Sequence, residues 1–214
     1  MADMRAIADA VKAGRAKVVK QLVTEAVEQG ATADQILNQA LVVGMMELGE
    51  LFKNNEVYVP EVLIAARAMK AGMAIIKPMM LEQEIPMLGT VAIGTVKGDL
   101  HDIGKNLVGM MLEGSGFTVV DLGVDVGPEQ YVDAIKNQGA QIVAMSALLT
   151  TTMLSMKEII DAITAAGLRD QVKVMIGGAP VTKEFADEIG ADGYSIDAAS
   201  AAELAKKLIG ELKG

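Results

Sequence analysis

The hydrophobic period of the sequence changes near residue 90, and this change most limits how the chain can fold. From Thr90 onward, short runs rich in Val, Ile and Ala alternate with segments that have helical spacing. The runs lie at 90–96, 118–122, 142–145 and 172–176, and a short fifth run includes Tyr194. Helical segments are expected at 103–113, 129–138, 152–166, 183–189 and 198–212. The alternation predicts a parallel sheet, because parallel strands need long crossover connections.

Five parallel strands with helices on both faces form a doubly wound, Rossmann-like (flavodoxin-like) fold. We therefore predict an α/β domain over residues 87–214. Ligands of such open sheets bind where the carboxyl ends of the strands meet the following loops. The site should lie at the loops after Val96, Met145 and Ile176.

Residues 1–86 instead repeat apolar side chains at helical spacing, and they predict a helical bundle domain of about four helices. One helix is expected over 15–29 and should stop at Gly30, a residue suited to the end of a helix. Thr32 and Gln35 have the spacing of a capping box, which begins the next helix.

Asn54 and Asn55 should end that helix. Pro60 suits the first turn of the following helix, whose apolar stripe continues toward Met80. Residues 82–86 carry charge and a proline without periodicity, so they are the expected linker between the two domains.

Composition argues against several classes of function. The net charge of −9 disfavours binding to nucleic acid or to an anionic membrane surface, both of which attract basic patches. The chain has no cysteine, which excludes disulfides, a thiolate nucleophile and Cys-based metal sites. No apolar run approaches the roughly 20 residues that cross a bilayer, and the N-terminus lacks the apolar core of a signal peptide. We expect a cytoplasmic protein.

The loop after the first predicted strand carries the only histidine of the chain, His101. Residues 97–106 read Lys-Gly-Asp-Leu-His-Asp-Ile-Gly-Lys-Asn. Five residues separate Gly98 from Gly104 and Asn106 ends the run, so the pattern of a phosphate-binding P-loop fails. The dinucleotide fingerprint also fails, because no Gly-x-Gly-x-x-Gly follows the strand. What remains is Asp-x-His-x-x-Gly at the ligand edge of the sheet.

Neutral imidazole is a good cobalt ligand through one ring nitrogen, and a carboxylate that accepts the other N–H fixes the ring's tautomer and orientation. Asp99 is near enough to His101 to accept that hydrogen bond. An arbitrary lone histidine in a loop is more often solvated or caps the next helix. Residue types alone also fit a hydrolase triad completed by Ser146 or Thr152. Ser146, however, lacks the Gly-x-Ser-x-Gly elbow that exposes such a nucleophile.

The run Gly98 to Asn106 resembles the cobalamin-binding motif of methionine synthase and of the corrinoid proteins that serve methanol, methylamine and aryl methyl ether methyltransferases. Ser146-Ala147-Leu148 resembles the family's Ser-x-Leu element, and Gly177-Gly178 resembles its Gly-Gly element. The order and spacing of these motifs make the combination specific. The similarity covers nearly the whole chain, including its helical part.

This resemblance implies a cobalamin or related corrinoid whose own lower base leaves the cobalt, while the nucleotide tail enters a slot beside the sheet. His101 would then be the lower cobalt ligand and Asp99 its hydrogen-bond partner. Thr152 falls where methionine synthase has a serine, the third member of a proton-linked chain. It keeps the hydroxyl but adds a methyl group, which puts the tuning of that chain in doubt.

The resemblance also distributes cofactor contacts over the loops at the ligand edge. Besides Asp99 and His101, the expected contacts are Gly98, Leu100, Asp102, Ile103, Gly104, Ser146, Leu148, Thr150, Gly177, Gly178, Tyr194 and Ala198. The two adjacent glycines would let backbone approach the nucleotide. Taken alone, a Gly-Gly pair is more often an ordinary turn.

The helical domain resembles the family's cap over the upper face of the corrin. There a Phe is followed, after six residues, by an apolar residue and Pro, and Phe52, Val59 and Pro60 fit this pattern. Val59 replaces the leucine of methionine synthase. Periodicity alone would place Phe52 and Val59 in the bundle core.

The implied function is that of a methyl carrier, a subunit rather than a stand-alone catalyst. Cobalt would take a methyl group from a donor held by a substrate-specific methyltransferase, giving methylcobalamin. A methyl-accepting methyltransferase would pass it to tetrahydrofolate or a thiol coenzyme, and a reductive activase is a further expected partner. The alternatives are a cobalamin-binding sensor, which would need a separate DNA-binding module, and the cobalamin subunit of a mutase, which would use the adenosyl cofactor.

Overall fold

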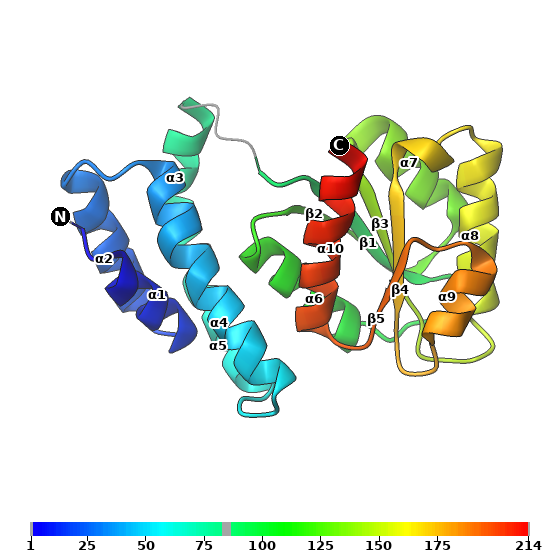
Figure 1. The fold of residues 1–214 in the computed structure, drawn as a ribbon, viewed down its shortest axis with the longest axis horizontal. Helices are drawn as coiled ribbons and strands as arrows, with labels where there is room; N and C mark the ends of the chain where they lie inside the picture. Colours follow the sequence, from blue (N-terminus) through cyan, green and yellow to red (C-terminus); the bar gives the residue numbers. More distant parts are fainter. Residues whose placement is uncertain (1, 83–86, 214) are drawn as a thin grey trace. The chain divides into compact units, whose positions relative to one another are not determined.

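The computed structural model describes residues 2–82 and 87–213, and Figure 1 shows the course of the chain. Two compact units are present, Met1–Met87 together with Glu113–Gly116, and Leu88–Leu112 together with Phe117–Gly214. The linker expected at 82–86 lies outside the described residues, except for Glu82, which ends the last helix of the first unit. The hydrophobic residues of each unit form its own core.

The helical unit consists of short and long helices in sequence. They are α1 (Met4–Lys12), α2 (Ala16–Glu28), α3 (Ala33–Ile36), the π-helical turn η1 (Leu37–Leu41), α4 (Val42–Lys53) and α5 (Val59–Glu82). The Asp3 carboxylate caps α1 by accepting the Ala6 N–H at 3.0 Å. Gly30, with a φ of 84°, ends the turn after α2 as expected. Thr32 and Gln35 form both hydrogen bonds of the predicted capping box.

Helices α3, η1 and α4 follow one another without a break, where the sequence predicted one regular helix. The π turn is a local widening that leaves no mark in the apolar spacing. Helix α4 ends at Lys53, and Pro60 is the second residue of α5, as predicted. The core of this unit includes Ile7, Val11, Val19, Val23, Ile36, Leu41, Met45, Leu48, Val62, Met69 and Ile76.

The second unit is built on a five-stranded parallel sheet of order β2-β1-β3-β4-β5, which confirms the predicted doubly wound fold. Its strands are β1 (Thr90–Val96), β2 (Thr118–Val126), β3 (Ile142–Ser146), β4 (Lys173–Gly177) and β5 (Gly193–Ser195). Its helices are α6 (Ile103–Gly114), α7 (Pro128–Gln138), α8 (Leu154–Ala165), the 3-10 turn η2 (Arg169–Gln171), α9 (Lys183–Ile189) and α10 (Ala198–Lys213). Helices α7, α8 and α9 cover one face of the sheet, and α6 and α10 cover the other (Figure 1).

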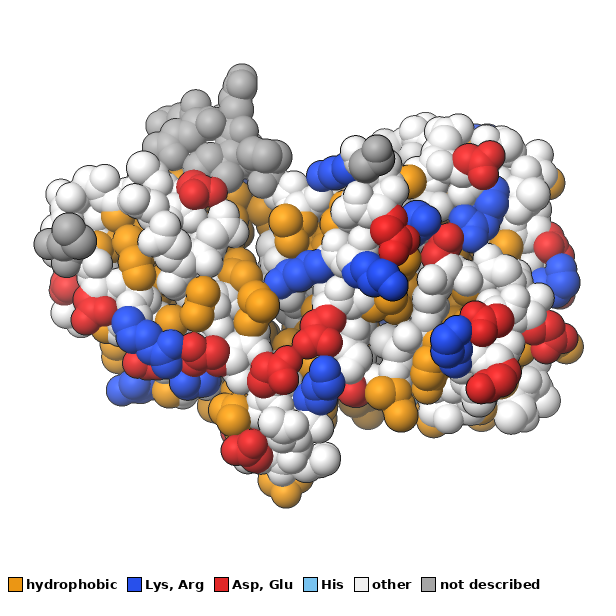
Figure 2. Space-filling model, in the orientation of Figure 1, with side chains coloured by type: hydrophobic (Ala, Val, Ile, Leu, Met, Phe, Trp, Pro, Cys, Tyr) orange, Lys and Arg blue, Asp and Glu red, His pale blue; other side chains and the backbone are white. Residues whose placement is uncertain are grey.

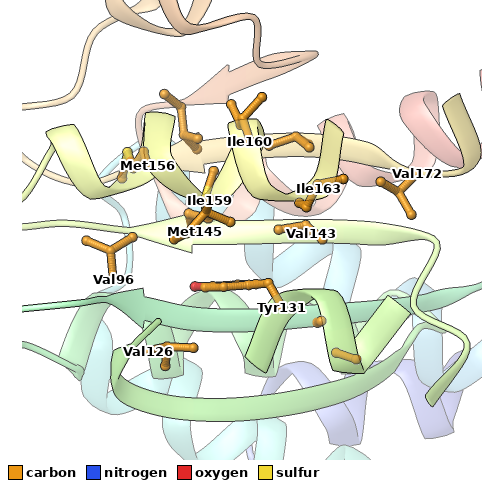
Figure 3. Packing of buried hydrophobic residues seen from close by; sticks show 14 of the residues in the cluster. Val96, Val126, Tyr131, Val143, Met145, Met156, Ile159, Ile160, Ile163 and Val172 are labelled. Atoms are coloured by element: carbon orange, nitrogen blue, oxygen red, sulfur yellow. The ribbon is translucent and has the colours of Figure 1, made fainter. Parts of the chain in front are cut away.

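The core on the α7–α9 side follows from the alternation of side chains along each strand. Figure 3 shows Val143 and Met145 of β3 beneath the isoleucines of α8, with Tyr131 of α7 nearby. Apart from Ser146 at its end, β3 is buried. Burial of each such aliphatic side chain stabilises the fold by about 1.5–3 kcal/mol, and this rigid base positions the loops at the strand ends.

Strand β2 differs from its prediction, since it runs to Val126 instead of 122. Its pairing with β1 shifts register on either side of Gly94. Gly123 and Asp125 adopt left-handed conformations there, with φ of 86° and 55°. Such an irregularity re-aims side chains at the end of a strand. The run Gly-Val-Asp-Val was not predicted as strand because its apolar signal is weak.

Charged side chains of both signs lie close together on the surface shown in Figure 2. Several form pairs one helical turn apart, such as Lys157 with Asp161 and Lys183 with Asp187. No helix formed by the described residues is long and apolar enough to cross a membrane.

Candidate functional site

The loop between β1 and α6 is held in a tight turn at its start. Gly98 has a φ of 83°, a conformation that suits glycine, and the Asp99 N–H donates to the Val96 carbonyl at 3.1 Å. The turn points the Asp99 side chain into the protein, where it is fully buried. At the other end of the loop, the Asp102 carbonyl accepts the Asn106 N–H at 2.7 Å and so begins α6.

The buried Asp99 carboxylate joins two of the predicted ligand loops. Its Oδ1 accepts the backbone N–H of His101 at 3.0 Å and lies 2.7 Å from Nδ1 of the same residue. Its Oδ2 accepts the Leu148 N–H at 2.7 Å, the Leu149 N–H at 3.3 Å and the Thr152 hydroxyl at 2.9 Å. The structure therefore brings together Asp99, His101 and Thr152, which the sequence singled out as a chain.

Hydrogen bonds keep this carboxyl group ionised. Burial by itself raises the pKa of Asp99, but the donors from His101, Leu148 and Thr152 together outweigh it and hold the pKa well below its usual range. A carboxylate can only accept hydrogen bonds, so the Thr152 hydroxyl donates to it. That hydroxyl also lies 2.9 Å from the Leu149 carbonyl, which gives it a second acceptor.

The ionised carboxylate also determines the tautomer of His101. Because Asp99 accepts, Nδ1 must carry the proton, and in a neutral ring the lone pair is then on Nε2. Nε2 is left to bind a group from outside the chain, and the side chain is 53% exposed. The Thr95 hydroxyl of β1 donates to the His101 carbonyl at 2.9 Å and fixes the backbone behind the ring.

The Gly-Gly pair follows β4 and contacts the loop after β3. The Ala147 N–H donates to the Gly177 carbonyl at 3.2 Å. A Cβ on Gly178, whose φ is 128°, would lie 1.9 Å from the Ala147 carbonyl oxygen. Gly178 is thus required by the close approach of two loops of this chain, which is a reason that the sequence did not predict.

The other expected contact residues differ in exposure. Gly98, Leu100, Asp102, Ile103, Gly104, Leu148 and Thr150 are exposed, Ser146, Gly177, Gly178 and Tyr194 are half-buried, and Ala198 is buried. Tyr194 packs against the core of the sheet unit. Phe52 near the end of α4 and Val59 at the start of α5 are both half-buried and belong to the helical unit.

Large apolar side chains are exposed around the histidine loop and at the neighbouring strand ends. They are Leu100, Ile103, Leu148, Leu149, Leu154 and Ile196, and the last of these is 80% exposed. They follow β1, β3 and β5, whose carboxyl ends share one edge of the sheet. Such a concentration of apolar surface marks a ligand or partner site.

The side chains of the site suit a metal that is already coordinated mostly by a cofactor. Among the described residues, no group of three His, Cys, Asp or Glu side chains could hold a metal ion. A single oriented imidazole surrounded by apolar side chains suits a metal held in an apolar macrocycle, to which His101 would add one nitrogen ligand. The site therefore fits a corrinoid.

Two contacts to the histidine loop were missed in the sequence. Asp125 of β2 accepts the Gly98 N–H at 2.7 Å through Oδ1, and its own N–H donates to the Asp99 carbonyl at 3.0 Å. Thr95 binds the His101 carbonyl. Neither Asp125 nor Thr95 belongs to a recognised motif. Asp125 in addition lies far from this loop in the sequence, and only the folded sheet brings β2 beside it.

The chain is similar to known proteins over almost all its length. Residues 89–204 match a family model described as a B12 binding domain, and residues 4–77 match a second model with the same description. Trimethylamine corrinoid protein 1 of Methanosarcina acetivorans is 45% identical over 188 residues, which cover 87% of each chain. A corrinoid protein of Desulfitobacterium hafniense is 40% identical over 92% of this chain and 93% of its own.

Two solved structures resemble the fold. One is a cobalamin-binding protein from Desulfitobacterium hafniense, with a TM-score of 0.82, 33% identity, and coverage of 97% of this chain and 99% of that one. The other is the methanol:cobalamin methyltransferase complex of Methanosarcina barkeri, in which the matched chain has a TM-score of 0.84 and 31% identity. That match covers 97% of this chain and 79% of the other.

Proposed function

This chain belongs to the B12-binding corrinoid proteins of methyltransferase systems, and from that membership we propose that it carries a methyl group on a corrinoid whose cobalt is bound by His101. The corrinoid would be bound with its own lower base displaced. The observation that carries the proposal is the buried Asp99 carboxylate, which leaves His101 Nε2 as the nitrogen available to a metal.

The chain's own residues perform the binding and the orientation. Asp99 holds the imidazole in one tautomer and one rotamer, because the carboxylate is itself fixed by donors from the loop after β3. Thr152 supplies one of these donors and fills the place of the proposed third member of the chain. A hydrogen bond to a charged acceptor raises the basicity of the ligand nitrogen.

The apolar side chains at the strand ends would exclude water from the underside of the ring. When bound, the corrinoid supplies the metal that accepts and releases the methyl group. The other residues that remain proposed contacts of the ring or its tail are Gly98, Leu100, Asp102, Ile103, Gly104, Ser146, Leu148, Thr150, Gly177, Gly178, Tyr194 and Ala198. Phe52 and Val59 remain proposed contacts of the upper face, supplied by the helical unit.

We propose two methyltransferase partners. The first would be a substrate-specific methyltransferase, and the solved methanol:cobalamin methyltransferase complex, one chain of which resembles this protein, supports such a pairing. The second would be a methyl-accepting methyltransferase. Several relatives are named trimethylamine or dimethylamine corrinoid proteins, so methylamines are candidate methyl donors for the partner of this chain. The acceptor would be tetrahydrofolate or a thiol coenzyme, and a reductive activase would serve the same cobalt.

The test uses the fact that the chain has one histidine. Protein grown with nitrogen-15 histidine is reconstituted with cobalamin, reduced to the cobalt(II) state and studied by electron paramagnetic resonance. The nitrogen splitting should change with the isotope, because the ligand nitrogen comes from His101. His101→Ala should lose the protein nitrogen splitting and change the absorption spectrum of bound methylcobalamin.

Lys97→Ala is the matched control, since Lys97 is an exposed side chain of the same loop. It should retain the isotope-dependent splitting. The ligand role of His101 is refuted if the nitrogen splitting is the same with and without nitrogen-15 histidine. It is also refuted if His101→Ala has the wild-type absorption spectrum. Methyl loading by a candidate methyltransferase, followed by mass spectrometry of the released cofactor, then tests the carrier role itself.

A further inference from the structure

The histidine loop is held from two directions, and the second of them comes from β2. On one side the loop after β3 binds the Asp99 carboxylate. On the other, Asp125 accepts the Gly98 N–H at 2.7 Å and donates its own N–H to the Asp99 carbonyl at 3.0 Å. Asp125 thus contacts the backbone on both sides of the Gly98–Asp99 peptide bond without touching the imidazole.

Asp125 has a backbone conformation that is unusual for a residue other than glycine. Its φ of 55° is left-handed, and the only other described residue besides glycine with a positive φ is Asn55. Aspartate tolerates this conformation better than most residues, but it persists only where surrounding contacts require it. Here the conformation turns both the N–H and the carboxylate toward the loop.

A buried lysine fixes the start of the same irregular segment. Lys105 of α6 is 3% exposed, and its Nζ contacts both carboxylate oxygens of Asp121, at 2.5 and 2.6 Å. Asp121 also accepts the Gly123 N–H at 2.9 Å. Because α6 follows the histidine loop directly, the loop and the β2 segment are tied to each other at both ends.

We propose that Asp125 is a positioning residue that sets how strongly His101 binds cobalt, by fixing the backbone of the loop from the β2 side. The inference rests on the proposed function, because it requires His101 to be the ligand. Without the Asp125 carboxylate, Gly98 and Asp99 gain freedom, and the imidazole spends less time in the orientation that ligation needs. The ionised Asp99 and the tautomer of His101 would not change.

The test compares Asp125→Gly with the wild type, both loaded with methylcobalamin. Glycine tolerates the left-handed backbone and removes the acceptor, and the comparison with Asp125→Asn below separates loss of the acceptor from the added backbone freedom of glycine. The absorption spectrum is followed as pH falls, because protons compete with cobalt for the imidazole. Loss of one charge-assisted hydrogen bond should weaken ligation roughly fivefold, which raises the midpoint of ligand loss by about 0.7 pH units. Asp125→Asn, which keeps an oxygen acceptor and tolerates the same φ, should return the midpoint most of the way to the wild-type value.

Asn55→Gly is the control for backbone strain, since it makes the same kind of change in the helical unit. It should leave the midpoint unaltered. The inference is overturned if Asp125→Gly loses the ligand at the same pH as the wild type. It is also overturned if Asp125→Asn shifts that pH as far as Asp125→Gly does. If Asp125→Gly fails to fold, Asp125→Ser, whose side-chain oxygen is one bond nearer the backbone than that of aspartate, takes its place against Asp125→Asn. The spectrum of His101→Ala distinguishes failure of this inference from failure of the proposed function. A wild-type spectrum for His101→Ala contradicts the ligand role of His101, whereas a changed spectrum leaves only the role of Asp125 in question.

Discussion

At the scale of single residues, the site depends on a carboxylate supplied with as many donors as it can accept. An ionised aspartate has about four lone-pair positions, and five donors surround that of Asp99: the backbone and ring of His101, the Leu148 N–H, the more distant Leu149 N–H and the Thr152 hydroxyl. A fully satisfied buried carboxylate is stable and ionised, whereas one that loses a donor carries an uncompensated desolvation cost.

Thr152→Val tests this balance. Valine keeps the shape and removes the hydroxyl, so we expect the free energy of unfolding to fall by about 1–2 kcal/mol and the pKa of Asp99 to rise. Denaturant unfolding of the apoprotein measures the first effect. Thr164→Val is the matched control, because that hydroxyl only donates to the Ile160 carbonyl of its own helix. Equal losses in the two variants would contradict the role given to the Asp99 contact.

Gly178→Ala tests the close approach of two loops. The added Cβ would lie 1.9 Å from the Ala147 carbonyl oxygen, so the loops must separate, and we expect a loss of about 3 kcal/mol in unfolding free energy. Gly167→Ala separates this clash from backbone strain, since Gly167 also has a positive φ, of 71°, but no atom near its would-be Cβ. It should cost only about 1–2 kcal/mol. Similar losses in the two variants would show that the loops can separate easily.

At the scale of elements, helices α1 and α4 are joined by an ion cluster. Glu47 of α4 contacts Arg5, which it binds through both carboxylate oxygens, and Lys12, whose Nζ lies 2.7 Å away. These hydrogen bonds, that of Arg5 first, lower the pKa of Glu47 to about 2. The side chain is 33% exposed, so solvent screens much of the effect.

Glu47→Gln should therefore destabilise the protein in a pH-dependent way. Because the folded pKa is depressed, the stabilisation is complete above the unfolded value near 4.5 and is lost as pH falls toward 2. After allowance for screening we expect a difference of about 1 kcal/mol at neutral pH. Unfolding curves at several pH values measure it. Glu25→Gln, whose partner is the neutral amide of Gln21, should show no such pH-dependent gap.

The sequence predicts most of these elements, because parallel strands and amphipathic helices leave periodic patterns. Strand β1 spans the expected residues, and the convergence of the loops after β1 and β3 follows from the parallel sheet. The backbone donors of Leu148 and Leu149 leave no side-chain signature, so they could not be predicted. The end of β2 and the contacts of Asp125 depend on a register shift that has no local pattern. The ligand role of His101 stays a prediction.

At the scale of the whole molecule, two units with separate cores should respond differently to a ligand. Addition of hydroxocobalamin at about one hundred times its dissociation constant stabilises the state that binds it by about 2.7 kcal/mol. Hydrogen exchange should slow at the amides of residues 97–104 and 147–152, where the candidate site lies. The amides of α1 and α2 serve as the internal reference. Slowing in α1 and α2 equal to that at residues 97–104, or none at residues 97–104, would contradict the placement of the site.

The donors of Asp99 also determine whether this binding loop can be moved to another protein. The histidine and its carboxylate lie in one short stretch, but the groups that satisfy the carboxylate come from a second loop about fifty positions later in the chain. A graft of residues 97–104 onto a foreign open sheet would bring the charge with the donors of His101 but without those of Leu148, Leu149 and Thr152. A graft that keeps the orientation and tautomer of the imidazole must therefore include both loops at their native spacing.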